Sequence, residues 1–170
     1  MADDFSSSER TYTDFIDLIS FVDYFILNEL TENIDAYRLS TCMHKEKSEP
    51  LRMGPVWDLN IGYNRQDRGP TTDWIANYNQ YVSRDAWMVP FWWPRLLEDL
   101  VFQSALQNRW NEFRSNTLSN INVLGLVNTS SEFLISNGAI ERNYIKWNCI
   151  PVDYPSVVSD LKRYLEDRLS

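Results

Sequence analysis

Apolar residues recur at helical spacing early in the chain, over about three turns. The stripe consists of Phe21, Tyr24, Phe25, Leu27 and Leu30. Ser20 precedes the stripe and can cap a helix, and Asp23 three residues later can reach back to it. Polar residues replace apolar ones at Thr31–Asn33. We therefore expect a largely buried helix that begins at Ser20 and ends near Thr31.

A short hairpin is expected next. Residues Arg38–Lys45 alternate loosely between apolar and polar, Lys47–Pro50 is typical of a turn, and Leu51–Met53 is the expected return strand. Gly54–Pro55 breaks that strand. Val56–Leu59 then forms a short apolar segment with one charge, an aspartate, inside it.

The rest of the chain predicts a loop followed by helices. Asn64–Tyr81 is polar and predicts a long loop, a type of segment that is often functional. Helical spacing then returns, and Gly138 is an expected helix stop. Expected helical stretches are Pro90–Leu97, Phe102–Phe113, Leu118–Leu134, Ile140–Trp147 and Tyr154–Leu169. The pattern predicts a single domain over residues 1–170, mainly α (α+β), with a small β-hairpin near its start.

Composition supports a folded domain with an aromatic core. The 170 residues are 44% hydrophobic and 14% aromatic, which is typical of globular chains and not of disordered ones. Seven Trp, nine Tyr and eight Phe predict a core built largely from rings.

The net charge of the chain limits the classes of molecule that it is expected to bind. The net charge of −8 disfavours nucleic-acid binding, which depends on neutralising phosphates with cations. It does not exclude ATP, because a magnesium ion can reverse the field inside a cleft. No apolar run approaches the roughly 20 residues of a membrane span, and Met1–Ser6 lacks the features of a signal peptide. The compartment stays open.

The two cysteines indicate neither a disulfide scaffold nor a zinc site. Cys42 and Cys149 cannot build a disulfide scaffold, and no Cys/His spacing suits zinc. We expect two buried free thiols.

Two aspartates carry the main chemical hypothesis. Asp58 follows Asp35 by 23 residues, and a hairpin between them could bring both carboxylates to one site. Phosphoryl transfer needs two such groups, one for the attacking hydroxyl and one for magnesium. Burying Asp58 between Trp57 and Leu59 would be costly without a partner or a metal. The alternative is that Asp35 is a turn residue and Asp58 a structural one.

Other candidates have simpler explanations. His44 near Cys42 is expected to be an ordinary strand residue and not part of a nucleophile–base relay. Lys45 faces either a phosphate or solvent, and the sequence does not decide between them. Trp92 and Trp93 are expected in the core and not stacked on sugars.

The sequence resembles the CotH kinase family, the atypical protein kinases of the spore-coat-protein-H type. The resemblance covers nearly the whole chain, and its most specific part is the Trp-Asp motif with its upstream Asp. The similar stretches are Asp17–Leu30, Asn33–Asp35, Lys45, Gly54–Asn60, Pro90–Trp93 with Arg95–Leu97, and Arg109–Trp110 with Arg114.

The resemblance implies a protein-kinase-like fold that uses ATP and Mg²⁺ to phosphorylate protein hydroxyls. It implies Asp35 as the catalytic-loop aspartate, Asp58 as the magnesium ligand with Asn60 beside it, and Lys45 as a nucleotide contact. Spore coat or surface proteins are the implied substrates, and a spore coat, cell-surface or secreted location follows.

Two departures from the kinase pattern matter. Five residues after its Asp, a kinase catalytic loop carries an Asn that binds the second metal, and here Ser40 offers a weaker hydroxyl ligand. No Gly-rich loop or VAIK-like strand precedes Asp17. We expect the chain to be the C-terminal lobe portion, with little or no activity alone.

Three other functions stay open. The chain could be a non-catalytic kinase-like scaffold, to which Ser40 lends support. It could belong to a transferase that moves AMP or an amino acid, which the mass of the product would reveal. It could also be a carbohydrate-binding domain, if Trp92 and Trp93 are exposed.

Overall fold

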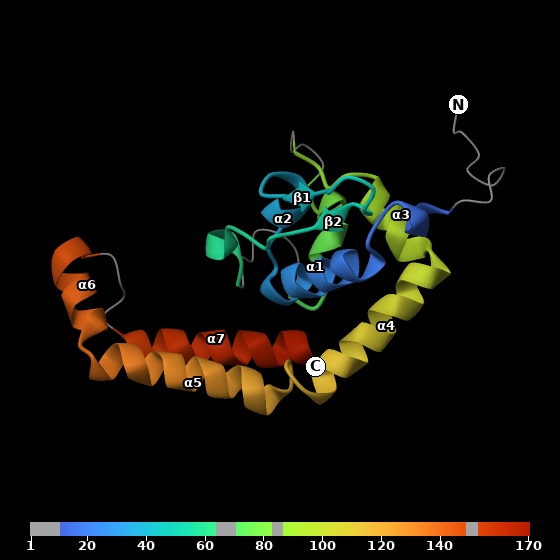
Figure 1. Cartoon of the computed structure of the whole chain (residues 1–170). Helices are drawn as coiled ribbons and strands as arrows, with labels where there is room; N and C mark the ends of the chain where they lie inside the picture. The colour runs from blue at the N-terminus through green and yellow to red at the C-terminus, as the bar shows by residue number, and fades with distance from the viewer. Residues whose placement is uncertain (1–10, 64–70, 83–86, 149–152) are drawn as a thin grey trace. The chain divides into compact units, whose positions relative to one another are not determined.

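The computed structural model describes residues 11–63, 71–82, 87–148 and 153–170. These residues are mainly helical and include one small antiparallel sheet (Figure 1), so the expected fold class is confirmed. The α-helices are α1 (Leu18–Thr31), α2 (Asp35–Arg38), α3 (Trp92–Glu98), α4 (Leu100–Ser115), α5 (Asn120–Ser136), α6 (Ala139–Trp147) and α7 (Tyr154–Leu169). The shorter elements are the 3₁₀ helices η2 (Tyr12–Asp14), η3 (Leu59–Ile61) and η4 (Ile75–Gln80), and the strands β1 (Met43–His44) and β2 (Arg52–Met53).

The chain divides into two compact units, Met1–Trp110 and Asn111–Ser170. The single domain over residues 1–170 stays a prediction. No helix within the described residues combines the length and apolar character that crossing a bilayer requires.

Helix α1 begins earlier than expected. Asp17 is its N-cap, and its carboxylate accepts a hydrogen bond from the Ser20 amide at 3.0 Å. The predicted cap at Ser20 is therefore wrong, because a carboxylate three residues upstream already satisfies that amide. Asp23 does not reach back to Ser20 and instead pairs with Arg109 of α4 at 2.7 Å. The expected end at Thr31 is confirmed.

Trp93 lies at the centre of the core of the first unit. Its side chain is fully buried, and rings of α1, α2 and α3 surround it. Centroid distances to these rings run from 4.6 Å for Trp92 and 4.9 Å for Tyr37 to 6.4 Å for Tyr24. The expected aromatic core is confirmed in this unit.

The hairpin is shorter than the sequence suggests. Met43 pairs with Met53 and His44 with Arg52, whereas Arg38 ends α2 instead of starting a strand. The return strand is attached to the start of α1, because the Met53 amide donates to Ser20 Oγ at 3.1 Å. This attachment places the segment that leads to Asp58.

Part of the expected long loop is helical. Residues 64–70 lie outside the described part of the chain, but η4 follows with Ile75, Ala76 and Tyr78 buried. The buried carboxylate of Glu29 accepts the Ile75 amide at 2.7 Å and the Ala76 amide at 2.9 Å. This distant cap holds the segment in place, and local sequence does not reveal it.

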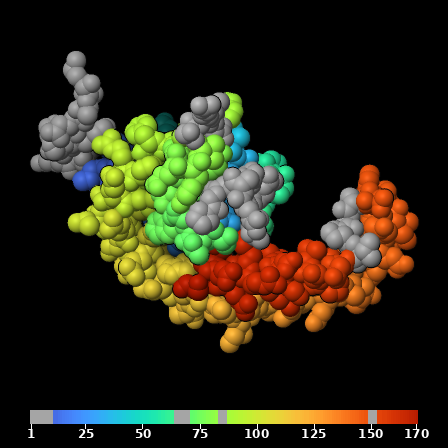
Figure 2. Space-filling model, turned by 180° about the vertical axis from the view of Figure 1, so that it is seen from behind, coloured from blue at the N-terminus to red at the C-terminus, as the bar shows by residue number. Residues whose placement is uncertain are grey.

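The second unit is built on α5 and α7, which lie side by side (Figures 1 and 2). Gly138, in the left-handed region with φ 62°, separates α5 from α6 and confirms the expected helix stop. The side chain of Asp153 caps α7, and this helix has the bounds expected from the sequence. On α7, Tyr164 and Leu165 are buried, whereas Val157 is exposed.

Candidate active site

Asp35 lies at the first position of α2, directly after the turn that ends α1. Glu32 adopts a left-handed conformation with φ 50° and reverses the chain. Ile34 and Tyr37 are fully buried and fix the turn on either side of Asp35. The Asp35 side chain keeps 20% of its surface exposed. Asp35 therefore lies where the chain leaves the buried helix α1 and reaches the surface.

Two side-chain hydroxyl groups donate hydrogen bonds to one backbone carbonyl of α2, that of Ala36. The Tyr24 hydroxyl donates to the Ala36 carbonyl at 2.9 Å, and Thr41 Oγ1 donates to it at 2.6 Å. Burial, with Cys42 nearby, raises the pKa of Tyr24 to about 12, so the hydroxyl keeps its proton at neutral pH. The short helix that carries Asp35 is therefore held to α1.

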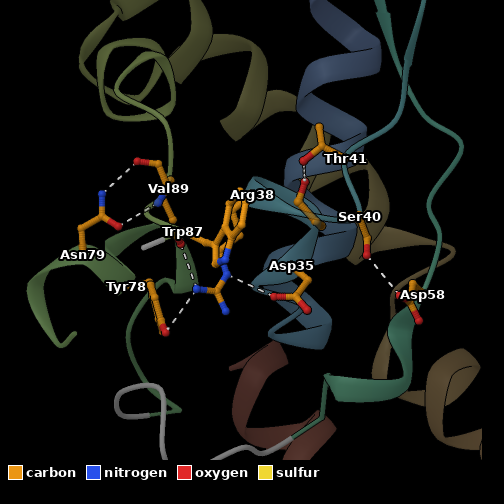
Figure 3. Close-up of polar contacts among 10 residues, drawn as sticks. Asp35, Arg38, Ser40, Thr41, Asp58, Tyr78, Asn79, Trp87 and Val89 are labelled. Atoms are coloured by element: carbon orange, nitrogen blue, oxygen red, sulfur yellow. Dashed lines mark hydrogen bonds and ion pairs between the residues drawn. The ribbon is translucent and has the colours of Figure 1, made fainter. Parts of the chain in front are cut away.

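Arg38 holds the carboxylate of Asp35 (Figure 3). Arg38 Nε lies 3.1 Å from Asp35 Oδ1. The guanidinium also donates to the Trp87 carbonyl at 2.9 Å and to the Tyr78 hydroxyl at 3.4 Å, and it stacks over the Tyr78 ring. The Arg38 side chain is only 9% exposed.

Asp58 lies in a strained, exposed turn. It has φ 62° and ψ 58°, a left-handed conformation that is rare outside glycine, asparagine and aspartate and is often found at functional sites. The cost of burying Asp58 between apolar residues does not arise, because Trp57 beside it is 60% exposed and Asp58 itself is exposed. The segment runs across the surface, so the charge stays solvated.

Ser40 joins the two aspartates. Its amide donates to the Asp35 carbonyl at 2.7 Å, and its hydroxyl donates to Asp58 Oδ2 at 3.1 Å (Figure 3). The two carboxylates have different partners, Arg38 for Asp35 and Ser40 for Asp58. Ser40 thus links the backbone of Asp35 to the side chain of Asp58, 23 positions further along the chain.

A buried asparagine links the same two loops a second time. Asn33, two residues before Asp35, is fully buried, and its Nδ2 lies 3.5 Å from the carbonyl of Trp57, the residue before Asp58. The same nitrogen lies 3.4 Å from Asn28 Oδ1 of α1. The relative placement of the two loops therefore depends on core contacts as well as on Ser40.

Comparison with protein-family models identifies the family. The model described as CotH kinase protein matches residues 2–170. The chain belongs to the CotH kinase family. The comparisons with curated proteins and with solved structures gave no match. Membership in a kinase family implies that a nucleotide and a substrate are used, and it confirms the resemblance found in the sequence.

The oxygen donors beside Asp58 fit the magnesium ion that the CotH kinase family implies. Asp58 offers a carboxylate, Ser40 a hydroxyl, and the exposed Asn60, in η3, a side-chain amide oxygen. Magnesium prefers such oxygen ligands and keeps several waters, so it needs few protein groups. Within the described residues, no group of three or more His, Cys, Asp or Glu residues could hold a metal ion. A site here would therefore depend on Asp58 with neutral oxygens.

Lys45 does not join this group. It is exposed, and its Nζ lies 3.5 Å from the carbonyl of the next residue, Glu46. The described contacts link it to neither aspartate, and its role as a nucleotide contact stays a prediction. His44 is an exposed strand residue paired with Arg52, and Cys42 is a half-buried free thiol. Cys149 lies outside the described residues.

Trp92 and Trp93 do not form a sugar-stacking surface. Trp93 is fully buried and Trp92 is half-buried against it. This overturns the carbohydrate-binding alternative, which required both side chains to be exposed. The expectation of core tryptophans holds in full for Trp93.

Sequence reasoning missed Arg38 and the residues that hold it. An Arg three residues after an Asp at the start of a helix is a local signal for an ion pair. Tyr78 and Trp87 carry no such signal, because they are 40 and 49 positions away from Arg38. Only the packed structure shows that they meet at the Arg38 guanidinium.

Proposed function

We propose that the protein transfers the γ-phosphoryl group of ATP to hydroxyl groups of proteins, and that this chain supplies the aspartate half of the site. Asp35 accepts the proton of the attacking hydroxyl. Asp58, with Ser40 and Asn60, would hold Mg²⁺, which when bound neutralises charge on the phosphates. Spore coat or surface proteins are the proposed substrates, consistent with the family.

The observation that carries the proposal is the double contact of Ser40. It occupies the position five residues after Asp35, where kinases carry a metal-binding Asn. Its hydroxyl lies 3.1 Å from Asp58, the proposed magnesium ligand. The contact of this residue with the proposed magnesium ligand supports the proposal.

The test is a transfer assay with γ-labelled ATP and Mg²⁺ on the full product of the gene, with this chain measured beside it. We expect Asp35→Asn and Asp58→Asn to reduce transfer by at least about 100-fold, because each removes a group needed in the transition state. Asp160→Asn, at an exposed position on α7, is the matched control and should keep full transfer. Mass spectrometry must show added phosphate; added AMP or an amino acid would contradict the reaction type.

A non-catalytic scaffold is the second candidate, and Ser40 is the observation that favours it. A hydroxyl is a weaker metal ligand than an amide oxygen, so a second metal would be held poorly. Mg²⁺-dependent binding of ATP that is lost on Asp58→Ala would argue against the scaffold. Unchanged binding in that variant, or none in the wild type, would favour it.

A further inference from the structure

We infer that Arg38 is a positioning residue for the proposed phosphoryl transfer, one that fixes the Asp35 carboxylate for the incoming hydroxyl. This inference rests on the proposed function. Arg38 contacts Asp35 through one nitrogen and one oxygen only, Nε to Oδ1 at 3.1 Å (Figure 3). Oδ2 has no contact among the described residues and is the oxygen left for the proton of the substrate.

Nη1 and one face of the guanidinium contact other groups, and these contacts help to fix the orientation of Arg38. Nη1 donates to the Trp87 carbonyl at 2.9 Å and lies 3.4 Å from the Tyr78 hydroxyl, and the guanidinium carbon lies 4.7 Å from the centroid of the Tyr78 ring. With 9% of its side chain exposed, Arg38 has little freedom to swing away. A planar, multiply bonded guanidinium is well suited to hold a carboxylate in one orientation.

The partners of Arg38 are themselves held in place. Asn79, next to Tyr78, clamps Val89 with two hydrogen bonds, from its Nδ2 to the Val89 carbonyl at 2.9 Å and from the Val89 amide to its Oδ1 at 2.8 Å. Glu29 caps the start of η4 from α1. The orientation of Asp35 is therefore coupled to η4 and to the residues around Trp87.

The chain offers a matched control. Arg163 pairs with Asp160 on α7 at the same spacing, three residues, and the same distance, 3.1 Å. That pair is exposed, with 71% and 59% of the two side chains accessible. Removing it should change little, because exposed ion pairs contribute little. A larger loss of activity in the Arg38 variant than in the Arg163 variant would therefore reflect the contact of Arg38 with Asp35, and not the loss of an ion pair in general.

The test measures kcat, KM and the Kd for Mg-ATP on the full product of the gene, for the wild type, Arg38→Ala, Arg38→Lys and Arg163→Ala. We expect Arg38→Ala to lower kcat by about 10- to 100-fold, the cost of a misplaced reacting group. KM for ATP and the Kd should stay within about twofold, because the contact between Ser40 and Asp58 is untouched. The kcat of Arg38→Lys should lie between those of the wild type and Arg38→Ala. Added guanidinium should restore part of the activity of Arg38→Ala.

Wild-type kcat in folded Arg38→Ala, or a loss carried by KM or Kd, would overturn the inference while leaving the proposed function intact. If Arg38→Ala fails to fold, Arg38→Lys decides, and wild-type kcat in that variant overturns the inference. A wild type that neither binds Mg-ATP nor transfers phosphate overturns the proposed function, and the inference with it.

Discussion

At the scale of single residues, Asp58 has an unusual, left-handed backbone conformation and an exposed side chain. Its φ of 62° is tolerated by Asp and Asn far better than by most other residues. The Ser40 hydroxyl donates to its carboxylate. An aspartate at this position therefore has two separate properties: it tolerates the left-handed backbone, and it supplies a carboxylate. Different substitutions can remove one property and keep the other.

Asp58→Asn should leave the fold intact and remove magnesium binding. An amide oxygen still accepts from Ser40, and Asn tolerates the left-handed region, so the free energy of unfolding should change by less than about 0.5 kcal/mol. Asp58→Val should lower it by about 1–3 kcal/mol, because a branched side chain is strained at this φ. Urea unfolding monitored by circular dichroism measures both. Equal losses in the two variants would contradict this account of the turn.

At the residue scale, the sequence pattern agrees with the burial on either side of Asp35 but not with the exposure of the segment around Asp58. The chemical roles of both residues stay proposals. The buried anchors Ile34 and Tyr37 are apolar and local, so the pattern shows a chain leaving the core at Asp35. The run from Val56 to Leu59 looks equally apolar, but Trp57 is exposed. Four consecutive residues of apolar character do not predict whether their side chains are buried. That depends on how the preceding hairpin packs.

At the scale of elements, caps explain where helices begin. Asp17 caps α1 and Asp153 caps α7 with the same contact, in which the backbone amide three residues on donates a hydrogen bond to the carboxylate. The sequence pattern predicted the bounds of α7 because its stripe starts at the cap. It missed the start of α1 because Ser20 lies inside the first turn and resembles a cap itself.

The junction between α3 and α4 should make stability depend on pH. Hydrogen bonds from the Tyr12 hydroxyl, at 2.6 Å, and then from the Phe102 amide lower the pKa of Asp99. A carboxyl whose pKa is lower in the folded state adds stability above its ordinary pKa of about 3.9, and this stability is lost as the pH falls through the folded-state value.

Tyr12→Phe removes the first of these donors. The loss in free energy of unfolding should be complete at pH 7 and should shrink as the pH falls below about 4. Unfolding measured from pH 7 down to pH 3 checks this, with Tyr144→Phe, at an exposed position on α6, as the control. A loss for Tyr12→Phe that does not vary with pH would refute the proposed linkage.

At the scale of the whole molecule, one ring cluster in the first unit joins α3 to α1 and to α2, the helix that carries Asp35. Trp93 packs against Phe21, Tyr24 and Phe25 of α1 and against Tyr37 of α2. Composition alone predicted an aromatic core. It did not show that the core ties α3 to the two helices flanking Asp35, because that pairing joins residues more than 50 positions apart.

Trp93→Ala should therefore destabilise the fold severely, by about 3–5 kcal/mol. Trp93→Phe should cost clearly less, because it keeps a ring and removes an indole N–H that is buried without a hydrogen-bond partner among the described residues. Thermal unfolding with near-ultraviolet circular dichroism measures the two variants. Similar losses for Ala and Phe would mean that the ring cluster does not carry the stability assigned to it.

The central proposal is that Asp58, with Ser40 and Asn60, binds a divalent cation close to Asp35. The most direct measurement is the broadening of backbone amide NMR signals by substoichiometric Mn²⁺, which stands in for Mg²⁺. The account predicts broadening at Asp58, Ser40 and Asp35, none at Asp160 on α7, and loss of the effect in Asp58→Asn. Broadening that survives Asp58→Asn, or that centres on another part of the chain, would contradict it.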